Sequence, residues 1–276
     1  MHIKFQNIHT LLVLQEFTHL HTYKLKMSVR QVVIPGDRIE VQSQQTGSTI
    51  TLGPHISLVP TSGTHTLSPT TLGLLEQKDL SSKRTIYYVE ANAKRYIPES
   101  GDNVIGVIIG SFGDFYRVSL NDFSAPTVLN QFSFPNASKK NRPRLEVGDL
   151  IYARVESVNP NVDAELSCID PATGKAEGFG KLEGGMIFKV RLAYARHLLF
   201  DPNAHILTEL VTKCKFEIAI GVNGKIWLKT DDIRTTIACG RCIEKSQLWK
   251  DGDVKTKVED VFTSMTKAKE DNDDEN

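Results

Sequence analysis

Basic side chains gather in one short stretch of this sequence, within six consecutive positions. They are Lys139, Lys140, Arg142 and Arg144. Hydrogen-bonding side chains that could hold a nucleic-acid backbone in register lie beside them at Asn136, Ser138 and Asn141. Clustered cations with polar neighbours suit the binding of phosphate groups. A solvated basic loop without a ligand is the alternative interpretation.

The residues around this cluster indicate how it is positioned. Pro135 and Pro143 bracket it and restrict the backbone, so the charges are presented on a partly stiffened arc. A run typical of a β-strand, residues 150–155, follows closely. The sequence therefore predicts a basic loop on the rim of a β-structure.

Composition limits the classes of protein to which the chain can belong. Its 276 residues allow two or three small domains, and 40% hydrophobic with 24% charged residues is ordinary for a globular protein. The formal net charge is zero, so nucleic acid would bind through local patches. The longest apolar run, residues 104–109, is too short to span a bilayer. Four scattered cysteines are typical of a reducing compartment.

The amino-terminal part divides at about residue 27. Residues 1–27 have neither the apolar centre of a secretory peptide nor a compact set of metal ligands, so we expect a disordered extension, with Met27 as an alternative natural start. Residues 28–96 combine strand-like runs with a stretch rich in Ser, Thr, Gly and Pro. They predict a small all-β domain with long loops.

Residues 97–172 have the strand count and spacing of a five-stranded OB barrel, a fold that binds single-stranded nucleic acid. The predicted strands are residues 103–109, 115–120, 128–134, 150–155 and 164–169. Aromatic side chains at Phe112, Phe115 and Tyr116, with Arg117, lie where such a barrel offers stacking groups. Strand alternation sends Phe115 and Arg117 to one face and Tyr116 to the other, so one of these two aromatic rings belongs to the core.

The pattern becomes mixed α and β in residues 173–250. Glycines at 178, 180, 184 and 185 predict a flexible connector that allows close approach of the backbone. The expected order is then a strand, two helices, two strands and a helix, which is the order of a KH domain. Its predicted elements are residues 186–190, 191–199, 204–213, 216–220 and 225–229, with the last helix from about residue 232. In residues 251–276, apolar spacing predicts a helix over 253–269, and residues 270–275 form an acidic tail that we expect to be disordered.

Several of these segments resemble one family. They are residues 94–98, 103–110, 134–143, 147–155, 178–182 and 221–227. A barrel that carries the sequence NASKKNRP, followed by a KH-like unit with GxNG, is similar to the S1/KH cap subunits of the eukaryotic RNA exosome, the ribosomal RNA-processing protein 40 family. The resemblance extends from about residue 31 to about residue 247. It implies an S1-type OB barrel, and so a multidomain chain that is mainly β with an α+β KH-like part.

The resemblance also implies a function. Such cap subunits are non-catalytic, stabilise a ring of subunits and guide single-stranded RNA to a separate 3′-to-5′ exoribonuclease in rRNA processing and RNA decay. The implied partners are RNA, the ring subunits, the other cap subunits and that nuclease, and the implied locations are the nucleus, nucleolus and cytoplasm. By matching position, the residues expected to contact RNA are Lys139, Lys140 and Arg142. Arg144 lies just beyond the matching segment.

The GxNG residues Gly221, Asn223 and Gly224 favour a structural interpretation over an RNA clamp. A KH domain that grips RNA does so with a GxxG loop between its first two helices, and the connection at residues 199–203 contains no glycine. Asn-Gly between two apolar runs instead predicts a tight hairpin turn whose two central residues have positive φ. We therefore expect substitutions of these glycines to damage stability or domain docking more than RNA affinity.

The sequence favours a protein that is not an enzyme and needs no cofactor or metal. The spacing of the aspartates brings no carboxylates together for metal-dependent cleavage, and Asp231 with Asp232 is more simply a helix cap. The single pair Cys239 and Cys242 lacks further ligands for a tetrahedral site, which favours burial in the core. Two rival functions remain: a free-standing S1/KH RNA-binding adaptor in translation or splicing, and an RNA-cleaving enzyme.

Overall fold

The structure, a computed structural model, describes residues 31–39, 49–61, 64–81, 84–91, 93, 95–159, 161–201 and 204–273. The described residues fall into two compact units, one within Leu20–Ala93 and one within Lys94–Asn276. Each unit is described separately below. The predicted extension over residues 1–27 and the alternative start at Met27 lie outside the described residues.

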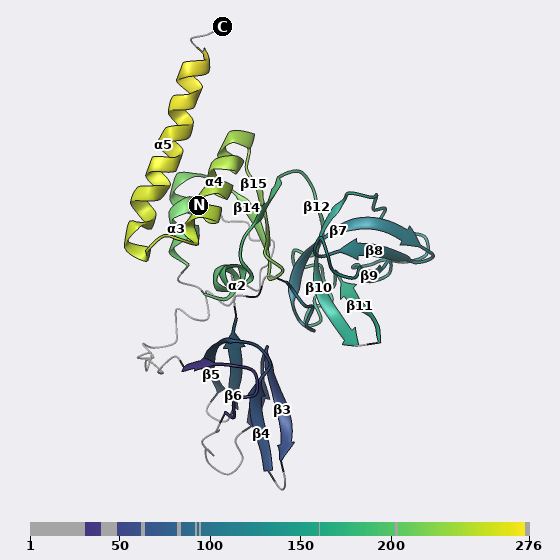
Figure 1. Cartoon of the computed structure of the whole chain (residues 1–276). Helices are drawn as coiled ribbons and strands as arrows, with labels where there is room; N and C mark the ends of the chain where they lie inside the picture. Colours follow the sequence, from purple (N-terminus) through teal and green to yellow (C-terminus); the bar gives the residue numbers. More distant parts are fainter. Residues whose placement is uncertain are drawn as a thin grey trace. The chain divides into compact units, whose positions relative to one another are not determined.

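The first unit is built only from strands in its described part, as the sequence predicts (Figure 1). A four-stranded sheet has the order β1-β5-β6-β2, and β3 and β4 form an antiparallel hairpin. The bounds are β1 Gln31–Val33, β2 Thr49–Leu52, β3 Ile56–Thr61, β4 Thr64–Pro69, β5 Gly73–Ser81 and β6 Arg84–Glu90. Alternate residues of β6, Tyr87 and Val89, are buried with Val33 and Leu67 in one small core. An isolated bridge from Ile39 to Leu67 attaches the hairpin to the chain that follows β1.

The second unit begins with the predicted five-stranded barrel. Its strands are β7 Asn103–Phe112, β8 Phe115–Ser119, β9 Thr127–Asn130, β10 Leu150–Asn159 and β11 Val162–Ser167. They pair in the order β11-β9-β8-β7-β10, and an additional β10–β11 pairing closes the barrel. Strand alternation sends β-branched and aliphatic residues such as Ile105, Val118 and Leu166 into its fully buried core.

The connector prediction for residues 178–185 is partly wrong. Residues Gly180–Leu182 form strand β12, which pairs antiparallel with β10 and extends the barrel sheet beyond the boundary predicted at residue 172. The nearby Phe179 is buried, with its ring 5.2 Å from that of Tyr152. The close approach expected of the glycines is real at Gly185, where an added Cβ would lie 2.8 Å from the indole nitrogen of Trp227.

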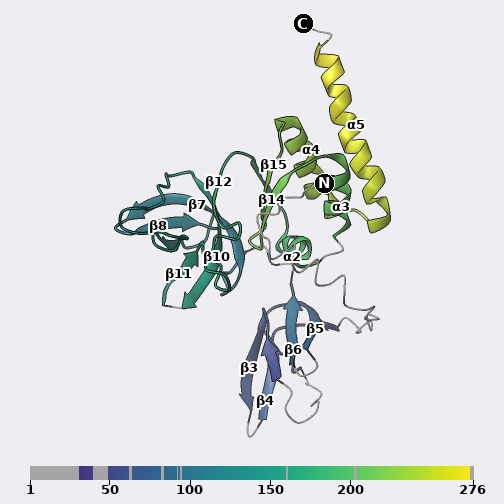
Figure 2. The same ribbon diagram turned by 180° about the vertical axis from the view of Figure 1, so that it is seen from behind.

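The rest of the second unit has the predicted KH order and is α+β. Strands β13 Met186–Lys189, β14 Glu217–Gly221 and β15 Lys225–Lys229 form a sheet in the order β13-β15-β14. Helices α2 Leu192–Phe200, α3 His205–Lys213 and α4 Ile233–Ser246 pack beside it (Figures 1 and 2). As expected, Asp232 caps α4, since its carboxylate accepts a hydrogen bond from the Thr235 N–H at 3.0 Å.

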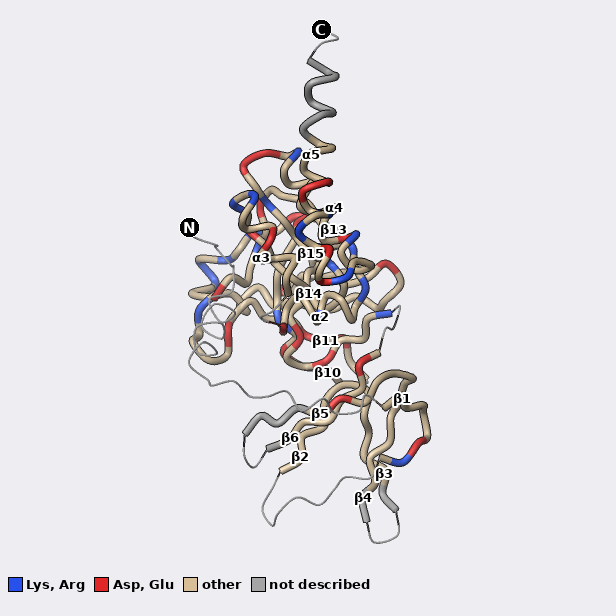
Figure 3. Tube along the Cα trace, turned by 90° about the vertical axis from the view of Figure 1, so that its left-hand side faces the viewer, with Lys and Arg blue, Asp and Glu red and all other residues tan. Residues whose placement is uncertain are grey.

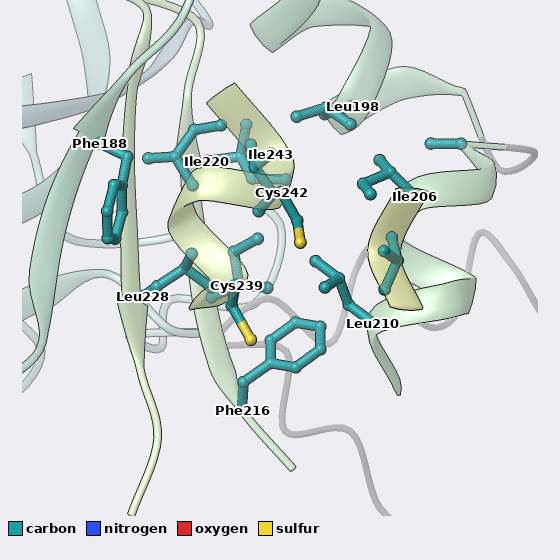
Figure 4. Packing of buried hydrophobic residues seen from close by; sticks show 14 of the residues in the cluster. Phe188, Leu198, Ile206, Leu210, Phe216, Ile220, Leu228, Cys239, Cys242 and Ile243 are labelled. Carbon is teal, nitrogen blue, oxygen red and sulfur yellow. The ribbon is translucent and has the colours of Figure 1, made fainter. Parts of the chain in front are cut away.

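The core of this part lies between the sheet and the helices (Figure 4). Apolar residues at helical spacing on α5, Val254 and Val258, complete it, which explains why the last helix packs on α3 and α4. A short 3₁₀ turn η1, Asp251–Asp253, precedes α5 Val254–Asp273. The helix therefore continues into the segment expected to be a disordered acidic tail from residue 270.

Charge is distributed unevenly along the described chain. Lys and Arg alternate with Asp and Glu over the KH part, whereas the described strands of the first unit carry few charges (Figure 3). No helix in the described part of the chain is both long enough and apolar enough to cross a membrane.

Candidate nucleic-acid interface

The residues predicted to bind phosphate lie on one exposed loop between β9 and β10, residues 136–144, which we call the basic loop. The backbones of Ser138 and Asn141 exchange two hydrogen bonds of 3.0 and 3.1 Å, and the Ser138 hydroxyl accepts another from the Asn141 N–H at 3.2 Å. Asn136 adopts a left-handed backbone with φ of 57°, which Asn tolerates better than most residues. Ser138 and Asn136 therefore shape the loop and leave their exposed surfaces open to solvent.

Three of the four cations of the basic loop are available to a ligand. Lys139, Lys140 and Arg144 are all exposed, and within the described ranges none of the three forms an ion pair. Their side chains are therefore open to the phosphate groups of a nucleic acid.

Arg142 differs from the other cations because the barrel holds it. Its guanidinium donates to the Asp114 carboxylate at 2.7 Å and to the Gln131 side-chain oxygen at 3.2 Å, and lies 5.2 Å from the centre of the Phe132 ring. The side chain is still 37% exposed. Arg142 therefore anchors the loop to the β7–β8 turn and can reach an anion only through its remaining surface.

Tyr116, which the sequence offers as a candidate to stack on RNA bases, lies inside the barrel. Strand alternation places its ring in the barrel core, where only 5% of the residue is exposed. Its hydroxyl donates to the Pro143 carbonyl at 2.6 Å and accepts from the Leu145 N–H at 3.3 Å. Tyr116 thus fixes the end of the basic loop from below and offers no face to a base.

Two of the aromatic side chains available for stacking, Phe112 and Phe115, lie at the β7–β8 turn. Their rings stack at a centroid distance of 5.6 Å, and the Arg117 guanidinium lies 5.8 Å from the centre of the Phe112 ring. Phe112 is 49% exposed. Asp114 lies between the two rings in sequence and binds Arg142, so this aromatic platform adjoins the basic loop. Strand alternation was the signal in the sequence that separated Phe115 from Tyr116.

The GxNG residues form a turn between β14 and β15, residues 221–224, which we call the docking turn. Gly221 pairs with Lys225, which leaves three residues in the loop, and the Gly224 N–H donates to the Gly221 carbonyl at 3.0 Å. Of these residues only Gly224 has a positive φ, 78°. The prediction of two central residues with positive φ is therefore wrong; the turn is the three-residue kind that ends in a left-handed glycine.

Asn223 explains why this turn forms, because its side chain is buried against the barrel. The amide nitrogen donates to the carbonyls of Ile105 at 2.9 Å and Leu120 at 3.0 Å, and the amide oxygen accepts from the Ile105 N–H at 3.2 Å. A backbone bond from Val222 to Asn103, 2.8 Å long, lies beside it. An added Cβ at Gly221 would collide with the Asn223 amide oxygen. The turn thus joins the KH sheet to the barrel.

The remaining candidate residues have structural surroundings. Cys239 and Cys242 are fully buried on α4. Among the described residues, no group of three or more His, Cys, Asp or Glu side chains is arranged to hold a metal ion.

Comparison with known proteins agrees with this architecture. Residues 96–180 match the family model of the exosome complex component RRP40 S1 domain, and residues 185–234 match a KH domain model. The chain is 46% identical to the exosome complex component RRP40 of Saccharomyces cerevisiae over 213 residues, which cover 76% of this chain and 86% of the yeast protein. The chain belongs to the RRP40 family. This confirms the resemblance inferred from the sequence.

Other RRP40 proteins are also similar to this chain. The Schizosaccharomyces pombe protein is 34% identical over 79% of this chain and 88% of its own length. The human protein is 38% identical over 58% of this chain and 57% of its own length. The RRP40 S1 match ends at residue 180, where β12 begins, so the family model also extends beyond the boundary predicted at residue 172. Both the basic loop and the docking turn lie inside the matched segments.

Proposed function

We propose that this chain is a non-catalytic, RNA-binding cap subunit of the RNA exosome. In this role it stabilises the ring of subunits and guides single-stranded RNA to a separate 3′-to-5′ exoribonuclease, in rRNA processing and RNA decay. Its partners are then RNA, the ring subunits, the other cap subunits and the nuclease, and it acts in the nucleus, nucleolus and cytoplasm. Membership of the RRP40 family, whose relatives are named exosome complex components, supports the assignment.

The observation that carries the RNA-binding part is the pairing of exposed cations with an exposed aromatic platform. Lys139 and Lys140 project from a loop whose carboxyl-terminal end is fixed both by the Arg142–Asp114 ion pair and by Tyr116. Phe112 and Phe115 stack beside the same turn. Cations for phosphates next to rings for bases are the combination with which proteins bind single strands without strict sequence preference.

The low RNA affinity expected of the basic loop also favours a subunit of a complex over a free-standing adaptor. Three phosphate contacts on a single strand give a salt slope of about −2, from about −0.7 for each contact. Such binding is weak unless neighbouring proteins contribute contacts along the same strand, in which case the combined affinity rises steeply. We therefore infer that the basic loop is one strip in a path that several subunits share.

The native mass and composition of the complex containing this chain test the assignment. The tagged chain, purified in high salt from its own cells, should be recovered with six ring subunits and two other caps. A small free species that still binds single-stranded RNA would contradict the subunit assignment and favour the S1/KH adaptor. Degradation of RNA by the pure chain with divalent cations would contradict the non-catalytic assignment.

A further inference from the structure

Two cysteines of the KH part are in direct contact, although the function proposed above uses neither. Cys214 follows the last residue of α3 and Cys239 lies in the middle of α4. Their sulfur atoms are 3.3 Å apart, and either thiol can donate a hydrogen bond to the other. Both are free thiols. Closure to a disulfide would bring the sulfurs to about 2.0 Å, which is a small movement for a residue at the end of a helix.

The two thiols differ in access to solvent. Cys214 is partly exposed and stands between the exposed residues Lys213 and Lys215, whereas Cys239 has no exposed surface. Figure 4 shows the Cys239 sulfur beside the ring of Phe216. A reagent dissolved in water can therefore reach Cys214 before it reaches Cys239.

The unequal burial of the two sulfurs favours a thiolate on Cys214 over one on Cys239. The hydrogen bond from Cys239 stabilises a thiolate on Cys214 and lowers the pKa of Cys214. The same bond and burial raise the pKa of Cys239, because charge on a fully enclosed sulfur is costly. An accessible thiol with a lowered pKa next to a second thiol is the arrangement typical of cysteines that respond to oxidants.

The other two cysteines lack this combination. Cys242 is fully buried, burial raises its pKa to about 12, and its sulfur points toward Leu210 in Figure 4. Cys168 lies in the barrel, fully buried, where its thiol faces the Tyr152 carbonyl at 3.7 Å and burial raises its pKa. All four cysteines lie in the described part of the chain, so the comparison between them is complete.

We propose that Cys214 and Cys239 are a peroxide-responsive pair that closes to a reversible disulfide. The Cys214 thiolate attacks one oxygen of hydrogen peroxide, the O–O bond breaks, and a sulfenic acid and water result after protonation. The Cys239 sulfur then attacks the Cys214 sulfur, the S–O bond breaks, and a second water leaves with the Cys239 proton. Two thiols and one peroxide thus give one disulfide and two waters, and a dithiol reductant reverses the change.

Formation of the Cys214–Cys239 disulfide affects the part of the KH fold that contacts the barrel. The two cysteines are 25 residues apart, and the segment between them contains β14, the docking turn and β15. A link across its base restricts the unfolded chain while leaving the native contacts in place. Oxidation should therefore stabilise the KH part and its attachment to the barrel.

The test is peptide mapping of the full chain after treatment with hydrogen peroxide and alkylation of the remaining thiols. We expect one new crosslinked peptide pair, Cys214 with Cys239, two hydrogen atoms lighter than its separate peptides and lost on addition of dithiothreitol. The oxidised chain should melt about 5 °C or more above the reduced chain. Cys168 should remain reduced and alkylate only after unfolding.

Matched variants separate the pair from the neighbouring CxxC cysteine. Cys242→Ser should retain the crosslink, whereas Cys214→Ser, at a partly exposed position, should abolish it and the change in melting temperature. The proposal is wrong if wild-type Cys214 ends as sulfinic or sulfonic acid without a crosslink, if the crosslink joins Cys242 or Cys168, or if all four thiols stay reduced. Mapping of the wild-type chain alone decides between these outcomes, even if a variant folds poorly.

Discussion

The docking turn and the basic loop both carry motifs that the sequence shares with RNA-binding proteins, and the structure gives the two segments opposite surroundings. In the docking turn, Asn223 is 4% exposed and both polar atoms of its side chain form hydrogen bonds with the barrel. In the basic loop, Lys139 and Lys140 are exposed. A glycine-rich motif whose polar groups already have partners joins domains, whereas a motif with solvated cations remains available to a ligand.

The difference extends to how each segment is held. The docking turn depends on close packing, because an added Cβ at Gly224 would lie 2.6 Å from the Val190 carbonyl. The basic loop depends on a few bonds at its carboxyl-terminal end, from Tyr116 and from Asp114 through Arg142. We therefore expect substitutions in the turn to change stability and substitutions in the loop to change RNA affinity.

The largest effect should come from Asn223→Ala. The substitution removes three buried hydrogen bonds. Three backbone groups then lose their partner: the Ile105 N–H, the Ile105 carbonyl and the Leu120 carbonyl. At about 1 kcal/mol for each bond, with a further penalty for unpaired buried groups, the free energy of unfolding should fall by roughly 3 kcal/mol or more. Urea unfolding of the full chain, followed by tryptophan fluorescence, measures it.

Asn136→Gly is the matched control for that variant. Asn136 is exposed and already has a positive φ that Gly adopts readily, so its unfolding free energy should change by less than about 0.5 kcal/mol. The comparison between the two segments fails if Asn223→Ala unfolds like the wild-type protein and loses RNA affinity instead.

The next largest effect should come from Lys139→Ala combined with Lys140→Ala. Removal of two phosphate contacts should make the salt slope of single-stranded RNA binding shallower by about 1.4 and weaken binding at low salt by about tenfold or more. The melting temperature should stay unchanged because both side chains are exposed. Fluorescence anisotropy with a labelled oligonucleotide over a range of salt concentrations provides the slope.

Lys250→Ala with Lys255→Ala removes the same charge from exposed positions in the KH part. This control should leave both the slope and the affinity close to those of the wild-type protein. An equal loss in the two double variants would mean that binding follows the total charge of the chain and not the basic loop.

Most of the fold could be predicted from periodicity. The five barrel strands, the KH order and the cap at Asp232 all follow from local pattern, because alternation and capping are properties of neighbouring residues. Strand β12 was missed because Gly180–Leu182 is too short to show alternation and is specified by its pairing with β10. The continuation of α5 to Asp273 was missed because an acidic composition suggested disorder.

The candidate site could be predicted only in part, for a related reason. The position of the basic loop follows from its composition, and alternation alone placed either Phe115 or Tyr116 in the core. The sequence does not show that Arg142 is tied to Asp114, 28 positions away, or that Asn223 reaches Ile105, 118 positions away. Such partners are fixed by tertiary structure, so pattern could locate the side chains without saying which remain free.

A smaller effect should come from Tyr116→Phe, which keeps the ring and removes the hydroxyl. The basic loop loses its bonds at Pro143 and Leu145, so the free energy of unfolding should fall by about 1 kcal/mol.

Phe112→Leu is the opposite case, because it removes an exposed ring. RNA binding should weaken by about 1–3 kcal/mol for a stacked base, with little change in stability. Thermal melts measure the stability of both variants, and fluorescence anisotropy measures their RNA affinity. If Tyr116→Phe changed neither stability nor RNA affinity, the structural role of its hydroxyl would be contradicted.

The smallest effect should come from Asp114→Asn, which tests whether Arg142 is an anchor or a ligand contact. The ion pair is largely solvated, so its loss should cost less than about 1 kcal/mol of stability. Freed from the carboxylate, Arg142 can turn toward a phosphate, and RNA affinity should rise by up to about threefold. Asp122→Asn breaks a more exposed pair with Lys189 and should leave affinity unchanged. A fall in RNA affinity for Asp114→Asn alone would mean that Asp114 holds Arg142 in its RNA-binding position. The ion pair would then both anchor the loop and preorganise it for RNA.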